Sequence, residues 1–234
     1  MTGRKIAILG SASSSLSQAP FNDSSWEIWA LGQETRRVSR FFEIHPDKLV
    51  KPWIRKQYND RNVPVYSISE IKGVDSLKIP VQEIADRLND GELYFTSSVA
   101  YMVGLALLEH ANGRTIDTIA IYGIDMLTVS EYAAQRPCLE YWLGMLKPMN
   151  IKKVIPSCSA LLKANHVYGY SEPPENNGPF TVDYLKKRIA QYRKNLADME
   201  KNCYVVTGAI QESELMLDYL QHFERGGHVP GSEA

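Results

Sequence analysis

Short apolar runs that stop at Gly or Pro recur along the first 156 residues and predict buried strands. They cover residues 5–10, 26–32, 40–46, 63–66, 116–122 and 152–156. Segments with the spacing of helices lie between them, at residues 47–58, 80–88, 97–111 and 139–146. Strands that alternate with helices predict an α/β fold with a Rossmann-like, mostly parallel sheet and helices on both faces.

The most apolar of these segments follows two serines. Ser97 and Ser98 open a helix that is apolar on nearly every side, so the helix must be buried. Free N–H groups at the start of a buried helix, together with hydroxyls, form a ready anion site, and Tyr101 lies one turn further on. The same hydroxyls also suit a simple N-cap, so both interpretations stay open.

The pattern changes after residue 167. Residues 168–180 are rich in Gly, Pro, Asn and Ser, which predicts a linker or a loop over the site. Apolar residues then follow alternating steps of three and four, as in a heptad seam: Val182, Leu185, Ile189, Tyr192, Leu196, Met199 and Cys203. With a break at Gly208, residues 181–225 are predicted to form a helical hairpin, and residues 226–234 a flexible tail.

Two roles for this hairpin remain open. It can pack on its own α/β domain, residues 1–167, or it can hold a homo-oligomer together. Its basic residues favour a solvated face, with nucleic-acid binding as a weakly supported alternative. These residues are Lys186, Lys187, Arg188, Arg193 and Lys194.

Composition narrows the class of protein. The chain has 234 residues and a hydrophobic content of 44%, which is enough for a sizeable core. Its net charge of −1 gives no general attraction to nucleic acid or anionic membranes. No N-terminal signal pattern is present, and the longest apolar run, residues 99–108, is too short to cross a bilayer. Three widely spaced cysteines fit a reducing compartment. We therefore expect a cytoplasmic protein without a membrane contact.

The loop after the first predicted strand is a candidate phosphate site. It starts at Gly10 and contains Ser11 and Ser13, and backbone N–H groups and hydroxyls in such a loop can surround phosphate oxygens. The loop matches neither the dinucleotide-binding nor the P-loop glycine pattern. A plain solvent-exposed turn is therefore the alternative.

Two further strand ends carry candidate chemistry. Glu43 and His45 are two residues apart, so they share one face of a strand, and His45 could carry a proton. Asp125 follows the strand at residues 116–122 and could bind a sugar hydroxyl or act as a base. Arg136 could pair with a phosphate or carboxylate. The alternatives are a histidine bonded to backbone, a surface glutamate and an aspartate that caps a helix.

Other motifs are weaker. Aromatic residues at positions 166–170 could stack on a base or sugar, or pack on the core. The five histidines are scattered and no Asp-x-Asp pair occurs, so we expect no metal. No nucleophile elbow occurs either. We also expect no cofactor, with a nucleotide-sugar entering as substrate.

The order of these motifs resembles bacterial sialyltransferases of the Campylobacter type and the related domain of motility-associated glycosylation proteins. Uncharacterised phage proteins share the pattern. The resemblance covers roughly residues 4–160. The motifs that carry it are Trp-Ala-Leu-Gly at 29–32, Phe-Phe-Glu-Ile-His-Pro at 41–46, Thr-Ser-Ser-Val-Ala-Tyr-Met at 96–102, Ile-Tyr-Gly-Ile-Asp-Met at 121–126 and Glu-Tyr at 131–132.

The resemblance implies that these positions surround the cytidine nucleotide of a donor sugar. It adds Tyr132 and Gln33 as base or ribose contacts, although Gln33 stands near where the family has an asparagine. The family's catalytic histidine should fall within residues 135–138, where this chain has none. A nucleotide cradle without sialyl transfer is therefore expected.

Three functions compete at this point. The first is a glycosyltransferase-like enzyme, which a phage could encode. Its acceptor would be a small molecule, a nucleotide or a DNA-linked group. It would use Glu43, His45 or Asp125 as the general base. The second is a nucleoside or nucleotide N-glycosidic hydrolase or transferase. The third is a non-catalytic protein that sequesters a nucleotide. A structural protein without a nucleotide site is the remaining alternative.

Overall fold

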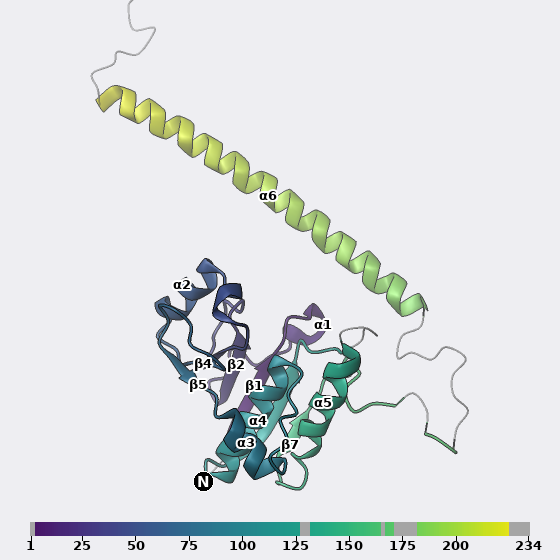
Figure 1. The fold of residues 1–234 in the computed structure, drawn as a ribbon. Helices are drawn as coiled ribbons and strands as arrows, with labels where there is room; N and C mark the ends of the chain where they lie inside the picture. Colours follow the sequence, from purple (N-terminus) through teal and green to yellow (C-terminus); the bar gives the residue numbers. More distant parts are fainter. Residues whose placement is uncertain (1–2, 127–131, 165–166, 171–181, 225–234) are drawn as a thin grey trace, which may run out of the picture. The chain divides into compact units, whose positions relative to one another are not determined.

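The structure is a computed structural model of the chain and describes residues 3–126, 132–164, 167–170 and 182–224. Within these ranges, the side chains of residues 132, 182–184, 223 and 224 are not described. The chain divides into two compact units, Met1–Ala164 and Asn165–Ala234 (Figure 1). Residues 171–180 of the predicted linker and the predicted tail at 226–234 lie outside the described residues.

The first unit is built on a seven-stranded sheet in which every pair of neighbouring strands is parallel. The strands are β1 (Arg4–Leu9), β2 (Trp26–Leu31), β3 (Arg40–Glu43), β4 (Val65–Ser67), β5 (Ser76–Lys78), β6 (Ile116–Tyr122) and β7 (Lys152–Val154). Their order across the sheet is β5-β4-β3-β2-β1-β6-β7. The predicted Rossmann-like α/β fold is confirmed.

Helices connect the strands, as the alternating pattern predicts. They are α1 (Ser13–Leu16), the 3₁₀ turn η1 (Asp47–Leu49), α2 (Pro52–Asp60), α3 (Val81–Leu88), α4 (Ser98–Ala111) and α5 (Tyr132–Gly144). The sequence analysis missed β5 and α1, because elements of three and four residues are too short to display a period.

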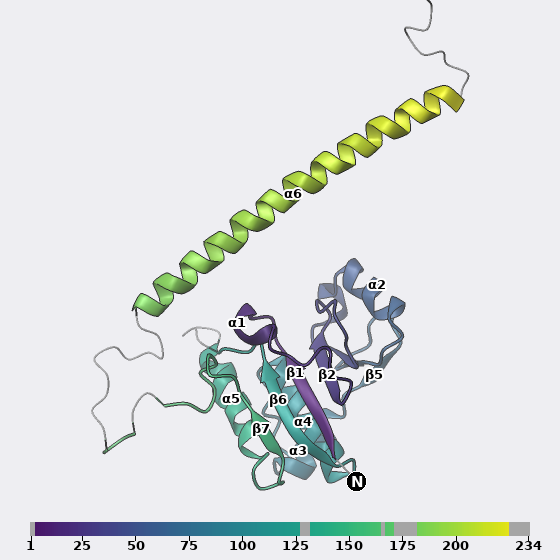
Figure 2. The same ribbon diagram turned by 180° about the vertical axis from the view of Figure 1, so that it is seen from behind.

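Side chains of the strands alternate between two apolar layers. Ile6 and Ile8 pack in the larger layer with α3, α4 and α5, whereas Ala7 and Leu9 pack in a smaller one with residues of α2. Helix α4 supplies most of the larger layer, with ten of its fourteen residues buried, as its apolar sequence predicts. Seen from behind, β1, β6 and β7 lie in front of α3 and α4 (Figure 2).

A buried ion network fixes the direction of α4. Glu109, near the end of α4, pairs with Arg4 at 2.7 Å and with Arg40 at 2.6 Å. These arginines begin β1 and β3, so the C-terminus of α4 lies at the amino edge of the sheet. The N-terminus of α4, with Ser97 and Ser98, therefore lies towards the carboxyl edge, where Gly10 follows β1.

Glu27 belongs to the same network. Its carboxylate accepts hydrogen bonds from Arg4 at 2.5 and 2.8 Å and from the indole of Trp29 at 3.1 Å. Burial by itself would raise the pKa of Glu27, but these hydrogen bonds outweigh it and hold the pKa below its ordinary value. The amino edge of the sheet is thus stabilised by compensated charges.

The described residues of the second unit form one helix where a hairpin was predicted, so that prediction is wrong. Helix α6 runs without a break from Val182 to Glu224, over 43 residues. Gly208 does not end it, because one glycine inside a helix costs only about 1 kcal/mol relative to alanine. The apolar steps also keep the same register across Gly208, from Val206 to Ile210, Leu217 and Leu220.

In the described ranges, α6 and the shorter helices all lack the combination of length and apolar character that a membrane span requires.

Candidate functional site

The strand order marks one place on the sheet as special. From β1 the chain proceeds through β2, β3, β4 and β5 on one side, whereas β6 and β7 lie on the other side of β1. In open α/β sheets, ligands bind outside the carboxyl ends of the strands at such a switch point. The loops after β1, β2, β3 and β6 are therefore the first place to look for a site.

The loops after β1 and β6 are joined by backbone hydrogen bonds. The N–H of Gly10 donates to Tyr122 O at 2.8 Å, and the N–H of Ala12 donates to Gly123 O at 2.8 Å. The Ser15 hydroxyl accepts from the N–H of Gly123 at 2.8 Å. A Cβ at Gly10 would lie 2.4 Å from Gly123 O, so only glycine permits this approach. Backbone thus closes the space directly between the two loops.

Asp125 reinforces this junction. Its side chain is buried, and its carboxylate accepts a 2.5 Å hydrogen bond from the hydroxyl of Ser14. Its backbone oxygen accepts from the N–H of Ala160 at 3.0 Å. Asp125 was predicted to bind a sugar hydroxyl or act as a base, and these contacts give it a positioning role between two loops. The neighbouring Ser13 is exposed.

A pocket of about 350 Å³ opens beside the junction, between the loops after β1 and β2. Its volume lies at the lower end of the range for small-molecule sites. The predicted residues Gly10, Ser11 and Gln33 all line it. The complete lining is Leu9, Gly10, Ser11, Leu16, Ala30, Leu31, Gln33, Glu34, Thr35 and Arg36.

Two further residues of the pocket lining, Glu34 and Arg36, form an ion pair that the sequence did not predict. Arg36 donates to both carboxylate oxygens of Glu34, at 2.8 and 2.7 Å. Burial would raise the pKa of Glu34, but the hydrogen bonds from Arg36 hold it below its ordinary value. The same partner raises the pKa of Arg36, whose side chain stays 43% exposed. An acidic residue shortly after the second strand is a known ribose-binding signal, and it could have identified Glu34.

A second polar cluster lies at the end of β3. The Nδ1 atom of His45 is 2.7 Å from Glu43 Oε1, and the backbone N–H of His45 donates to the same oxygen at 3.1 Å. The hydroxyl of Tyr58, on α2, donates to Glu43 Oε2 at 3.0 Å. Burial, together with the Glu43 carboxylate, raises the pKa of Tyr58, so this hydroxyl stays protonated.

Exposure divides this cluster into an inner and an outer part. Glu43 is buried, whereas the His45 side chain is 62% exposed. A buried carboxylate that accepts the Nδ1 proton orients an imidazole so that Nε2 is presented as the base. The predicted pairing of Glu43 with His45 on one face is thus found, and Tyr58 is an addition for which the sequence held no local signal.

Gly32 connects the cluster to the pocket. It lies between the pocket-lining residues Leu31 and Gln33, and Leu31 is opposite Phe42 in the sheet, so Gly32 is level with Glu43. A Cβ at Gly32 would lie 2.4 Å from the hydroxyl oxygen of Tyr58. The two polar groups are therefore neighbours along the carboxyl edge.

The serines of α4 have a structural role. The Ser97 hydroxyl accepts from the N–H of Ala100 at 3.3 Å, which is an N-cap, and neither Ser97 nor Ser98 lines the 350 Å³ pocket. Tyr101 stacks on Phe95 with ring centroids 4.6 Å apart. Burial, with a contribution from Cys138, raises the pKa of Tyr101. The prediction that these residues cradle the same ligand as Gly10 stays a prediction.

The remaining candidates lie on α5 and beyond. Arg136 donates to Glu140 at 2.8 Å and to Lys163 O at 3.1 Å, which fastens α5 to the loop after β7. Tyr132 begins α5, and its side chain lies outside the described residues. Of the predicted aromatic motif, Tyr168 and Tyr170 are more than 90% exposed, and His166 lies outside the described residues.

Over the described part of the chain, His, Cys, Asp and Glu side chains form no group of three or more that could hold a metal ion. Comparisons of the chain with protein-family models, with curated proteins and with solved structures find no match.

Proposed function

We propose that the chain binds a nucleotide or nucleotide-sugar in the pocket between the loops after β1 and β2, and that it transfers a glycosyl group with His45 as the general base. One observation carries the proposal. A buried carboxylate, Glu43, holds an exposed imidazole at 2.7 Å, one strand away from a pocket at the carboxyl edge of a Rossmann-like sheet.

The pocket lining supports an anionic ligand with a ribose. Ser11 supplies a hydroxyl and Arg36 an accessible positive charge, and both suit phosphate oxygens. Glu34 follows the second strand, where α/β nucleotide sites place the carboxylate that accepts from ribose hydroxyls. Gln33 is exposed on the same rim and can contact the base or sugar.

The roles of the two residues in the dyad differ. Both oxygens of Glu43 already accept hydrogen bonds, from Tyr58 and from His45, so Glu43 serves as a positioning residue and not as a nucleophile. His45 would accept the proton of an acceptor hydroxyl at Nε2. The hydroxyl oxygen then forms a bond to the anomeric carbon, and the bond from that carbon to the phosphate oxygen breaks. The nucleotide leaves with the electron pair.

Thermal denaturation with nucleotides and nucleotide-sugars tests binding. A ligand at about 100 times its dissociation constant stabilises a protein by about 2.7 kcal/mol, which is an easily measured shift. Ser11→Tyr should fill the pocket and remove the shift. Ser17→Tyr is the matched control, because Ser17 is exposed in the same segment but does not line the pocket.

Release of free nucleotide from the stabilising nucleotide-sugar tests catalysis. His45→Asn should retain the thermal shift and lower the rate about 100- to 10,000-fold, the usual contribution of a general base. Binding with no turnover by the unmodified chain would favour a sequestering protein. The absence of a shift with every nucleotide, or an equal shift in Ser11→Tyr, would contradict the proposed site.

A further inference from the structure

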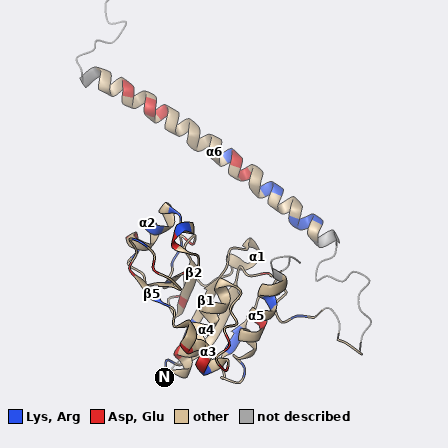
Figure 3. Cartoon of the chain, in the orientation of Figure 1, with Lys and Arg blue, Asp and Glu red and all other residues tan. Residues whose placement is uncertain are grey.

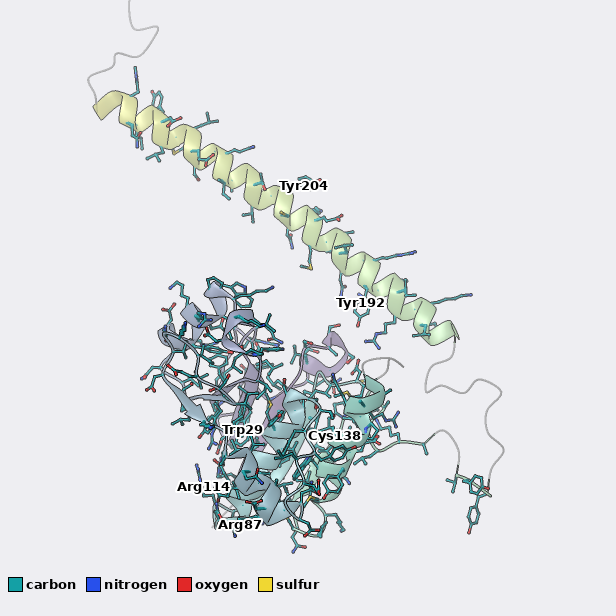
Figure 4. The ribbon with its side chains drawn as sticks, in the orientation of Figure 1. Trp29, Arg87, Arg114, Cys138, Tyr192 and Tyr204 are labelled. Carbon is teal, nitrogen blue, oxygen red and sulfur yellow. The ribbon has the colours of Figure 1, made fainter. Side chains whose placement is uncertain are left out.

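Helix α6 displays a continuous apolar seam on its surface. Its residues follow the heptad steps from Leu185 to Leu220, with Ser213 as the one polar position among them. Each large apolar member of the seam is between 42% and 69% exposed: Leu185, Ile189, Tyr192, Leu196, Met199, Val206, Ile210, Leu217 and Leu220. Side chains project from all sides of the helix, as Tyr192 and Tyr204 illustrate (Figure 4).

Such a surface needs a partner. Most of the stability of a helix in a protein comes from the packing of its apolar face, and a seam sustained over five heptads is the pattern of a coiled coil. A shallow, open hollow of about 430 Å³ lies on the second half of the seam, lined by Val205, Val206, Ala209, Ile210, Ser213, Glu214 and Leu217. The small residues Ala209 and Ser213 leave room there for side chains of another helix.

The charges of α6 are divided between its two halves. Residues 182–203 contain six Lys or Arg and three Asp or Glu, a net charge of +3. Residues 204–224 contain four Asp or Glu and no Lys or Arg, a net charge of −4. In the coloured ribbon, blue segments lie only in the first half of α6, with red segments among them, whereas the second half shows red segments and no blue ones (Figure 3).

We propose that α6 pairs with α6 of a second copy of this chain, in antiparallel orientation. Antiparallel pairing places the basic half of each helix along the acidic half of the other while the seams of both remain in contact. Parallel pairing would place like charges side by side over the whole length, about 64 Å at 1.5 Å per residue. Charge complementarity thus selects both the partner and its direction.

The oligomeric state of the full chain is the first test. Sedimentation equilibrium should give an even-numbered oligomer, and Ile189→Glu, which puts a charge into the seam, should dissociate it. Gln191→Glu is the matched control, because it adds the same charge two residues away, outside the seam, and should leave the mass unchanged. A monomeric unmodified chain, or equal behaviour of the two variants, would overturn the proposal.

Disulfide cross-linking tests the orientation. Leu185 and Leu217 are 32 positions apart in the sequence, about 48 Å along a helix, so a parallel pair cannot bring one against the other. With Cys203 replaced by Ser, a mixture of Leu185→Cys and Leu217→Cys chains should form the 185–217 cross-link under oxidation. Predominant 185–185 and 217–217 cross-links would establish a parallel pair and refute the antiparallel one.

Salt dependence provides an independent measure of orientation. The Debye length falls from about 10 Å at 0.1 M to about 3 Å at 1 M salt, so attraction between exposed charges weakens. The dissociation constant of an antiparallel pair should therefore rise several-fold with salt. A dissociation constant that falls with salt would mean that like charges face each other, which contradicts the proposal.

Discussion

The hydroxyl of Ser14 lies 2.5 Å from a carboxylate oxygen of Asp125, across 111 residues of sequence. Ser14 belongs to α1, directly after β1, and Asp125 follows β6. The bond therefore ties together the loops on both sides of the topological switch point. Asp125, which was predicted to bind a sugar hydroxyl or act as a base, thus helps to hold the loop beside the pocket, and its predicted role stays a prediction.

Ser14→Ala should lower the free energy of unfolding by about 1.5–3 kcal/mol, the usual worth of a hydrogen bond to a charged group. Urea denaturation would measure the loss. Ser17→Ala provides the comparison, since Ser17 is exposed three residues further on and should change stability by less than about 0.5 kcal/mol. Equal effects of the two substitutions would mean that the bond to Asp125 contributes nothing.

Gly123→Ala should destabilise the chain more than Gly113→Ala. Both glycines have positive φ, at +66° and +86°, where alanine costs about 1–2 kcal/mol. A Cβ at Gly123 would also lie 2.9 Å from Gly10 O, whereas a Cβ at Gly113 meets nothing within 4 Å. The free energy of unfolding, measured in urea, should therefore fall further for Gly123→Ala, by about 3 kcal/mol or more in all.

Glu109→Ala should cost about 3–5 kcal/mol, because it removes one partner of a buried ion pair and leaves the charge of Arg40 with less compensation. Only 8% of the Glu109 side chain and 9% of the Arg40 side chain are exposed. Arg114 also pairs with Glu109, at 2.9 Å, but its side chain is 55% exposed. Arg114→Ala should therefore cost less than about 1 kcal/mol. Similar losses for both variants would contradict this assignment.

Acid should destabilise the first unit through Glu27 and Glu34. The pKa of each carboxyl lies below its ordinary value of 4.5. As the pH falls below 4.5, the unfolded chain therefore binds more protons than the folded chain. Their stabilising contribution is thus complete above about pH 4.5 and is lost as pH falls through the folded pKa values. Melting temperatures measured from about pH 6 to pH 3 should decline, and Glu34→Gln should make the decline shallower. An unchanged slope in that variant would count against the Arg36 pairing.

Glu43→Gln should lower the rate of glycosyl transfer by about a hundredfold or more while nucleotide binding persists, because the amide no longer holds the imidazole as the carboxylate does. Steady-state kinetics would separate the two effects, with a lower kcat and an unchanged KM. Tyr58→Phe keeps the dyad and removes one donor to Glu43, so its rate should fall less. A larger loss in Tyr58→Phe than in Glu43→Gln would remove the reason to assign the base to His45.

Much of the candidate site was visible in the sequence as separate pieces. Gly10, Ser11 and Gln33 were predicted to contact a ligand, and they line one pocket. Glu43 and His45 were predicted to share a face, and they are hydrogen-bonded. The sequence carried a signal for Glu34 in its place after the second strand, but the addition of Tyr58 and the pairing of Arg36 with Glu34 required the folded chain, because they depend on how α2 and the loop after β2 pack. The prediction of a hairpin was wrong because a single glycine, Gly208, is a weak helix breaker and the heptad register continues across it.

The sequence by itself determined the alternation of strands and helices, the burial of α4 and the seam of α6, since apolar spacing within a few turns or residues encodes local structure and the face that is buried. Only the tertiary structure decided the strand order, the closure between Gly10 and Gly123, and the contact of Ser14 with Asp125. The two contacts join residues more than one hundred positions apart. Like the strand order, they arise from the packing of whole elements, which no local sequence pattern encodes.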